Sequence, residues 1–186
     1  MLTKKSSMNG VSWKFCEEND GSFYVENANH LPVLYFPLMN TAGMKSFVTP
    51  ELKGDVCKDF DHYLTTPTVT EEIHRNVSSR NFWIKVKDMD PWSATGQSVF
   101  QKINKWDCPK DAYSLKAKIG AFTTKRKQQE TGLETTITTF VPEGADLVEL
   151  LKITVTNTGQ EPQTFRPSYA LPLFGRSADN FRDHRQ

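Results

Sequence analysis

Apolar and polar residues alternate with a period of two along much of this chain. In the segment 81–87, Phe82, Ile84 and Val86 fall on one face of an extended backbone and the lysines fall on the other. The segment 151–156 alternates apolar residues with Lys or Thr in the same way. This period is typical of β-strands with one buried face. The pattern therefore predicts a protein built mainly of strands.

Turn signals separate these strands. Asn19-Asp20-Gly21 lies between the apolar-rich segments 12–16 and 22–26 and predicts a β-hairpin. Glu130-Thr131-Gly132 separates a predicted strand at Ala117–Thr124 from a Thr-rich, β-branched strand at Leu133–Val141, and Asn157-Thr158-Gly159 follows the strand at 151–156.

Helical signals are sparse. The ten prolines interrupt helical patterns throughout the chain, and Thr70–Asn76 is the one segment with the cap and acidic first turn of a short helix. Many short strands without alternating helices predict an all-β fold, a large antiparallel β-sandwich. We expect residues 1–20 to form an extension with a first strand, and 21–186 to form the sandwich domain.

The C-terminal part of the sequence changes character. Thr164–Phe174 has apolar residues at two-residue spacing and predicts a core strand. Residues 175–186 that follow are polar, densely charged and lack a closing element. We therefore expect the sandwich to be truncated at its C-terminus, with this segment as a loop leading to a further part of a larger protein.

Composition restricts the partners of the chain. Of 186 residues, 37% are hydrophobic and 24% charged, and the formal net charge is +1, so no overall field attracts nucleic acid or an anionic membrane. No apolar run reaches the roughly 20 residues of a membrane span. Three scattered cysteines give no disulfide framework, and no secretory signal is visible. We expect a cytoplasmic protein.

The charged end of the chain holds the strongest cluster of candidate site residues. Arginine forks and carboxylates suit paired hydrogen bonds to sugar hydroxyls or phosphate, or salt bridges to a neighbouring domain. The candidates are Arg176, Asp179, Asn180, Arg182, Asp183, His184 and Arg185.

Aromatic residues offer a second kind of contact, because a ring can cover the apolar face of a sugar. Trp92, in the turn-rich segment Pro91–Gly96, is the first candidate, and Trp83, Trp106, Tyr24 and Tyr35 are others. The four histidines have no second ligand at usable spacing, so we expect no metal and no cofactor. No catalytic residue can be assigned.

Several segments together carry a family resemblance. The more specific ones are Ser78-Ser79-Arg80-Asn81-Phe82-Trp83 and Arg176-Ser177-Ala178-Asp179-Asn180; others are Gly21–Asn27, His30–Pro32, Tyr35–Leu38, Trp92–Gly96, Thr139–Pro142, Val148–Leu150 and Lys152–Thr158. From about Gly21 onward the chain resembles the N-terminal domain of the glycoside phosphorylases of glycoside hydrolase family 94, formerly glycosyltransferase family 36. The 1,2-β-oligoglucan phosphorylase branch is the most similar.

This resemblance implies a super-sandwich of the galactose mutarotase-like kind, followed in the family by an (α/α)6 catalytic domain. In such enzymes inorganic phosphate is the co-substrate. It attacks the anomeric carbon of a β-glucan oligosaccharide with inversion while one carboxylic acid protonates the leaving oxygen. The resemblance also implies a homodimer, and it places the catalytic acid outside this chain.

Two other functions remain open from the residues alone. A stand-alone carbohydrate-binding sandwich would need an exposed aromatic strip on a complete fold. A sugar epimerase of the mutarotase type would need a His–carboxylate pair, and only His74 with Glu71 or Glu72 offers one nearby.

Overall fold

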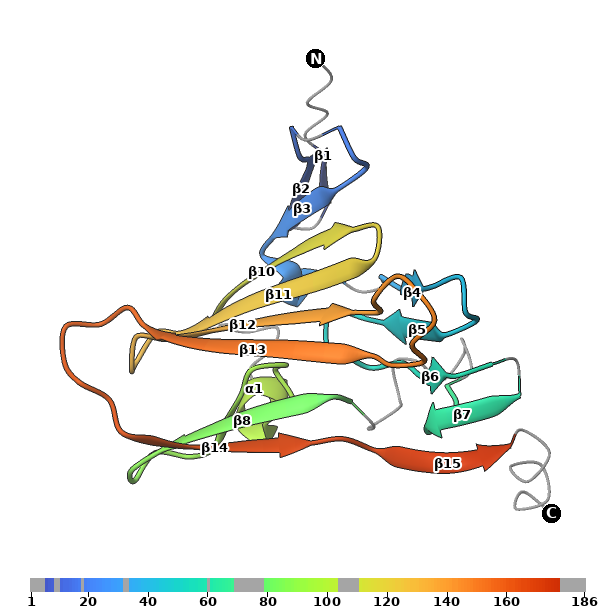
Figure 1. Ribbon diagram of the computed structural model, residues 1–186. Helices are drawn as coiled ribbons and strands as arrows, with labels where there is room; N and C mark the ends of the chain where they lie inside the picture. The colour runs from blue at the N-terminus through green and yellow to red at the C-terminus, as the bar shows by residue number, and fades with distance from the viewer. Residues whose placement is uncertain are drawn as a thin grey trace.

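The computed structural model has an all-β architecture, which confirms the predicted fold class (Figure 1). It describes residues 6–8, 11–17, 19–31, 34–59, 61–68, 79–103 and 111–177, with the backbone alone for 6–8 and 175–177. Three antiparallel sheets of seven, five and three strands make up the fold. No helix in these ranges is long and apolar enough to cross a membrane.

The largest sheet forms one layer of the sandwich. Its strands are β1 (Ser6–Met8), β2 (Val11–Phe15), β3 (Phe23–Glu26), β10 (Asp111–Lys118), β11 (Ala121–Gln128), β12 (Leu133–Phe140) and β13 (Leu150–Asn157), in that spatial order. Each strand pairs antiparallel with its neighbours, and β13 is one edge.

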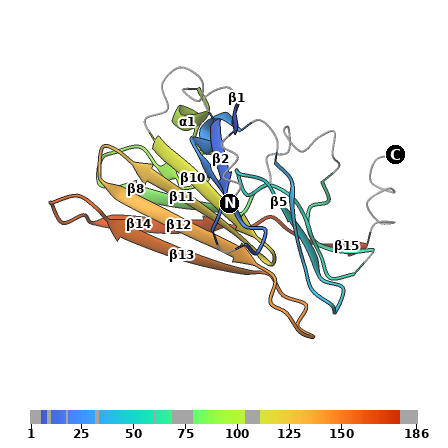
Figure 2. The same ribbon diagram turned by 90° about the horizontal axis from the view of Figure 1, so that it is seen from above.

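The two smaller sheets lie against this layer. The three-stranded sheet has the order β14 (Phe165–Ala170), β8 (Asn81–Val86), β9 (Trp92–Ser93). The five-stranded sheet has the order β15 (Leu173–Ser177), β7 (His62–Thr65), β6 (Val56–Cys57), β5 (Lys45–Val48), β4 (Phe36–Met39). A 3-10 turn η1 (Ala28–His30) and a short helix α1 (Val99–Ile103) complete the elements. Because β14 leads directly into β15, the two smaller sheets share one continuous edge (Figures 1 and 2).

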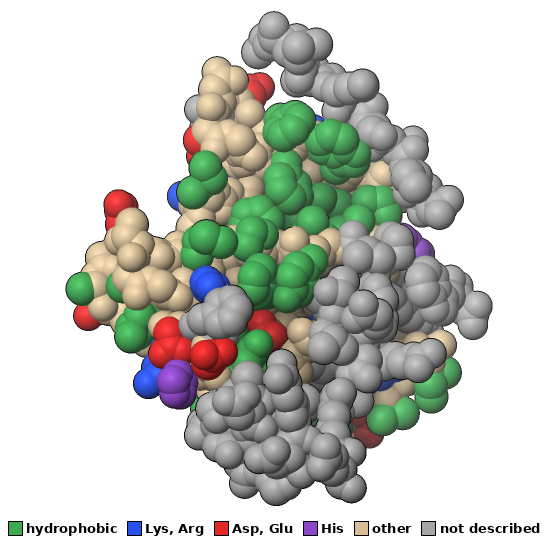
Figure 3. Space-filling model, turned by 90° about the vertical axis from the view of Figure 1, so that its right-hand side faces the viewer, with side chains coloured by type: hydrophobic (Ala, Val, Ile, Leu, Met, Phe, Trp, Pro, Cys, Tyr) green, Lys and Arg blue, Asp and Glu red, His purple; other side chains and the backbone are tan. Residues whose placement is uncertain are grey.

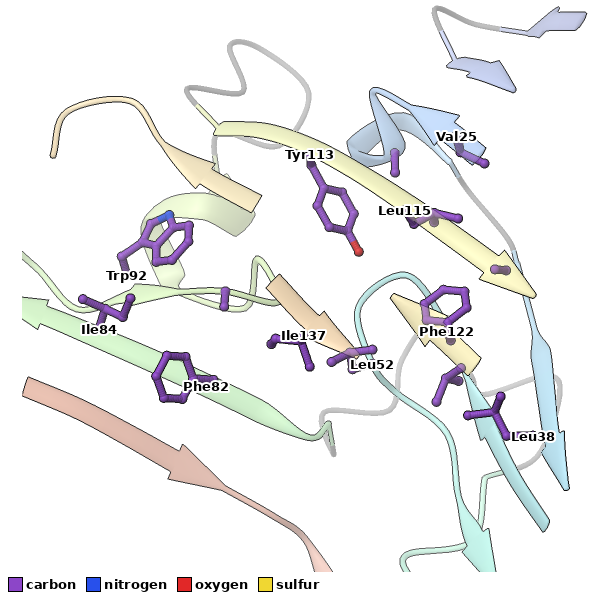
Figure 4. Close-up of a cluster of buried hydrophobic side chains, with 14 of the residues drawn as sticks. Val25, Leu38, Leu52, Phe82, Ile84, Trp92, Tyr113, Leu115, Phe122 and Ile137 are labelled. Carbon is purple, nitrogen blue, oxygen red and sulfur yellow. The ribbon is translucent and has the colours of Figure 1, made fainter. Parts of the chain in front are cut away.

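The core lies between the layers. Figure 4 shows Val25, Tyr113, Leu115, Phe122 and Ile137 of the large sheet facing side chains of the other two. The facing side chains include Leu38, Phe82, Ile84 and Trp92 from the strands of those sheets and Leu52 from the connection between β5 and β6. Each buried residue of this size contributes roughly 1.5–3 kcal/mol by removal from water, which makes this cluster the main stabilising element.

Two local predictions are confirmed. The turn at 19–21 joins β2 to β3, and both Asn19 and Gly21 adopt positive φ (55° and 77°). The Asp20 carboxylate accepts a hydrogen bond from the Ser22 amide at 2.9 Å, which fixes the turn. In β8, the predicted inner residues are buried, as the alternation required.

Two other predictions are wrong. The segment Ala117–Thr124 is not one strand, because the chain reverses at Ile119–Gly120 between β10 and β11, where Gly120 has φ 79°. The predicted core strand Thr164–Phe174 is two strands that are largely exposed. Each is the edge strand of its sheet: β14 pairs along one edge with β8, and β15 pairs along one edge with β7. The predicted helical turn Thr70–Asn76 lies outside the described residues.

Candidate docking face

The five-stranded sheet is apolar on both of its faces. Its inner face sends Leu38, Val48 and Val56 into the core, where each is at most 3% exposed. Its outer face carries a second apolar group, which we call the aromatic face. It consists of Tyr35, Pro37, Met39, Phe47, Cys57 and Tyr63. A sheet with water on one side normally alternates apolar with polar residues, so a second apolar face indicates a surface that something covers.

Strand register brings these residues together. Pro37 lies opposite Phe47, and Cys57 lies opposite Tyr63. Directly opposed residues of antiparallel strands project on the same side of the sheet with their Cβ atoms about 4.5–5.5 Å apart. Lys45 of β5 lies between Met39 of β4 and Cys57 of β6 and is opposite both of them. The aromatic face therefore includes one cation.

Much of the aromatic face is open to solvent. Tyr35 stacks on Phe47 with ring centroids 4.7 Å apart and an interplanar angle of 7°. Tyr35 is 37% exposed and Met39 is 56% exposed, whereas Cys57 is buried at 7% exposure. Figure 3 shows hydrophobic side chains gathered over this end of the molecule beside a group of acidic side chains. Just before β7, the Asp59 carboxylate accepts a 2.7 Å hydrogen bond from the ring of His62, the first residue of that strand.

The groups on the aromatic face stay protonated near neutrality. Burial, with a smaller contribution from the Asp55 carboxylate, raises the pKa of Tyr35. Burial and the neighbouring Cys57 raise the pKa of Tyr63. Burial also raises the pKa of the Cys57 thiol to about 12. The two phenols are therefore neutral hydrogen-bond donors, and the thiol is unreactive.

A buried ion pair lies behind this face. The Arg80 Nε donates to the Glu149 Oε1 at 2.5 Å, and its Nη2 donates to the Glu149 Oε2 at 3.0 Å. The side chains are 1% and 6% exposed, respectively. Ser46 of β5 joins the pair by donating to the Glu149 carboxylate and accepting from Arg80 Nη2 at 3.1 Å.

This ion pair joins all three sheets. Arg80 directly precedes β8, Glu149 directly precedes β13, and Ser46 belongs to β5. The guanidinium also donates to the carbonyl oxygens of Leu52 and Gly54 at 3.2 and 3.4 Å. Arginine presents five donors in a planar fork, which suits it to hold several segments at once. The pair therefore fixes the position of the five-stranded sheet relative to the other two.

Asp55 lies beside this centre. Its carboxylate is buried and accepts a hydrogen bond from the Thr68 amide at 2.9 Å. Burial raises the pKa of Asp55, although the Thr68 amide and Arg80 oppose the shift. Because the folded state favours the protonated form of this carboxyl group, Asp55 contributes less to the free energy of unfolding at neutral pH than at acidic pH.

Trp92, predicted as a sugar-stacking residue, is a core residue at 5% exposure. Its indole Nε1 donates to the Asp111 carboxylate at 3.1 and 3.2 Å, and Gln101 donates to the same group at 2.7 Å. Arg126 lies nearby, with its guanidinium carbon 3.8 Å from the centroid of the Tyr113 ring. The structure gives Trp92 a packing role, and a sugar contact there stays a prediction that its burial does not favour.

The predicted charged block begins at the edge of the aromatic face. The backbone of Arg176 lies in β15 opposite Tyr63. Asp179, Asn180, Arg182, Asp183, His184 and Arg185 lie outside the described residues, so their roles stay predictions. The same holds for His74, Glu71 and Glu72 of the epimerase hypothesis.

Sequence reasoning singled out Tyr35 of the aromatic face and missed the rest. The signal was present in the uninterrupted apolar run Leu34-Tyr35-Phe36-Pro37-Leu38-Met39. A continuous run is typical of a strand that is apolar on both faces. No signal in the sequence pairs Arg80 with Glu149, because 69 positions separate them.

Comparison with known families identifies the family of the chain. Residues 56–184 match the family described as glycosyl hydrolase 94, supersandwich domain. The matched range includes Arg80, Glu149 and the strands from β6 onward. No curated protein matches the chain.

Proposed function

Because the chain belongs to the glycosyl hydrolase 94 supersandwich family, we propose that it is the N-terminal scaffold domain of a glycoside phosphorylase. In this proposal an (α/α)6 catalytic domain of the same polypeptide transfers a glucosyl unit from a β-glucan oligosaccharide to inorganic phosphate, with inversion. In this proposal the enzyme uses no cofactor, and inorganic phosphate is its co-substrate. The substrate we favour is a 1,2-β-glucan, the enzyme is a homodimer, and its compartment is the cytoplasm.

The aromatic face carries this proposal, as the surface on which the catalytic domain docks. Its composition is that of a protein interface, since Tyr, Phe and Met are enriched in interface cores. Sugar sites need several polar groups that fix hydroxyls, whereas the polar groups of this face are two phenols and the Lys45 ammonium among a phenyl ring, a thioether, a proline and a buried thiol. The rigid backing by Arg80 and Glu149 suits a surface that must keep its shape when another domain packs on it.

The charged block 176–185 has a second role in the proposal. It continues from β15, whose backbone pairs with Tyr63 on the aromatic face. A chain that leaves the edge of a docking face enters the boundary between the two domains. We therefore assign Arg176, Asp179, Asn180, Arg182, Asp183, His184 and Arg185 to substrate or interdomain contacts.

The test uses the whole protein encoded by the gene. We expect its coding sequence to continue beyond Gln186 into a helical domain, and the protein to release α-glucose 1-phosphate from 1,2-β-gluco-oligosaccharides in phosphate. Met39→Lys should lower activity and loosen the association of the domains, detected by limited proteolysis. The control Ile119→Lys, at an even more exposed apolar site on a hairpin tip (87% exposed), should change neither. A stop codon after Gln186, or equal behaviour of the two variants, would refute the proposal.

A second candidate function is a stand-alone carbohydrate-binding module. The stacked and partly exposed Tyr35–Phe47 pair favours it, because exposed aromatic platforms bind sugar rings. Calorimetry with 1,2-β-gluco-oligosaccharides distinguishes the two. Heat that disappears in Tyr35→Ala would support the module, and no heat at millimolar sugar would remove it.

A further inference from the structure

A hollow lies on the outer face of the seven-stranded sheet, on the side away from the core. It has a volume of about 220 Å³ and is lined by Ser12, Lys14, Tyr24 and Glu26. We propose that this hollow binds a neutral saccharide unit. The site goes beyond the scaffold function and shares no residue with the aromatic face.

Strand register builds the hollow. Lys14 of β2 lies opposite Tyr24 of β3, and Ser12 lies opposite Glu26. Positions two apart on one strand project to the same side, so the four side chains form a square on the outer face. The volume is below the roughly 300–1,000 Å³ of sites for drug-sized ligands, which suits a ligand of about one ring.

The side chains of the hollow are unpartnered. Within the part of the chain that the structure describes, Ser12, Lys14, Tyr24 and Glu26 make no side-chain hydrogen bond or ion pair. Elsewhere on the outer face of this sheet some polar residues pair with one another, as the hydroxyls of Thr123 and Thr138 do at 3.1 Å. Lys125 contacts Glu134 at 2.9 Å across strands β11 and β12.

The chemistry of the lining selects the ligand class. Lys14 donates hydrogen bonds, Glu26 accepts them, and the hydroxyls of Ser12 and Tyr24 do both. The two formal charges cancel, so an anion meets repulsion from Glu26 and a cation meets repulsion from Lys14. The half-buried Tyr24 ring adds an apolar surface. A ligand with hydroxyls around its rim and an apolar C–H face matches all of these groups, and a pyranose has both.

The experiment titrates the isotopically labelled chain with a β-linked glucose disaccharide and follows backbone amide shifts by NMR. We expect saturable shifts at millimolar sugar that are centred on β2 and β3. Tyr24→Thr keeps strand propensity but removes the ring, and should weaken binding by about tenfold, since one buried ring contact is worth about 1.4 kcal/mol. Glu26→Gln should weaken binding by a smaller factor. The control Lys125→Gln, on the same face but paired in the parent, should bind as the parent does.

The outcomes separate this site from the docking face. Shifts centred on β4 and β5 would show a sugar site on the aromatic face and would overturn the inference. Unchanged affinity in Tyr24→Thr, with an unchanged melting curve, would also overturn it. Absence of any shift would overturn it while leaving the scaffold proposal intact, because that proposal is tested by the activity and proteolysis of the whole protein.

Discussion

Glu149→Gln tests the role of the buried ion pair in holding the three sheets together. The substitution keeps the size of the side chain but removes its charge. The Arg80 guanidinium then loses a carboxylate that accepts two of its hydrogen bonds, at 2.5 and 3.0 Å. The NH2 group of a glutamine at position 149 donates hydrogen bonds, and it would face the Arg80 guanidinium, which also only donates.

The magnitude follows from the burial of both groups. Removing one partner of a buried ion pair typically costs about 3–5 kcal/mol, because an uncompensated charge remains. In this protein Arg80 keeps its bonds to Ser46 and to the backbone carbonyls of Leu52, Gly54 and Asp55. We therefore expect a loss near the lower end, about 3 kcal/mol of unfolding free energy. For a chain of this size that corresponds to a fall in Tm of roughly 6–12 °C.

The assay is urea unfolding followed by circular dichroism, with thermal melting as a second measure. Glu134→Gln is the matched control, because it removes the carboxylate of a pair in which Lys125 is 51% exposed. Exposed pairs contribute about 0–1 kcal/mol, so this control should change little. The double variant Arg80→Met/Glu149→Leu should recover much of the stability. If Glu149→Gln costs no more than Glu134→Gln, the ion pair does not hold the sheets together.

Three further predictions concern residues around this centre. Because burial raises the pKa of Asp55 above its ordinary 3.8, the folded state binds this proton more tightly than the unfolded state, and stability falls as pH rises above about 4. Asp55→Asn should flatten that part of the pH–stability curve, and an unchanged slope would contradict the prediction. Gly54→Ala places a Cβ atom 2.0 Å from a backbone carbonyl oxygen of β5, whereas Gly144→Ala, at the same φ of 121°, meets nothing within 4 Å. Unfolding free energies should differ by at least about 2 kcal/mol, and equal losses would remove the steric argument. Cys57, buried and with its pKa raised to about 12, should react with a thiol reagent at pH 8 far more slowly than the partly exposed Cys16, as peptide mapping would detect.

Local pattern predicted the strands where one face is buried. The alternation in 81–87 placed Phe82, Ile84 and Val86 in the core, and the turn residues at 19–21 placed the first hairpin. The spacing of apolar residues and the identity of turn residues involve only neighbouring positions, so both can be seen in a single sequence. The hairpin at Ile119–Gly120 was missed although the buried positions change there from odd numbers in β10 to even numbers in β11, a shift that Gly120 with its positive φ marks.

The site depends on contacts that local pattern does not carry. Apolar spacing in β14 and β15 predicted burial, but burial also depends on which strands lie opposite, and Tyr169 and Leu173 are 46% and 77% exposed. Trp92 lay in a turn-rich segment, yet pairing of β9 with β8 buries it against Asp111. The Arg80–Glu149 pair arises from three segments far apart in the sequence, which only the folded topology brings together.

Oxidation of Met39 tests the docking face most directly. Met39 is 56% exposed on the aromatic face, whereas Met44 is fully buried in the core and provides an internal reference. Hydrogen peroxide converts accessible methionine to its sulfoxide, and mass spectrometry gives the rate at each site. In this chain alone, Met39 should oxidise much faster than Met44. If a catalytic domain of the whole protein packs on the aromatic face, as we propose, Met39 should there be protected to a rate near that of Met44. Equal Met39 rates in the chain and in the whole enzyme would contradict the account.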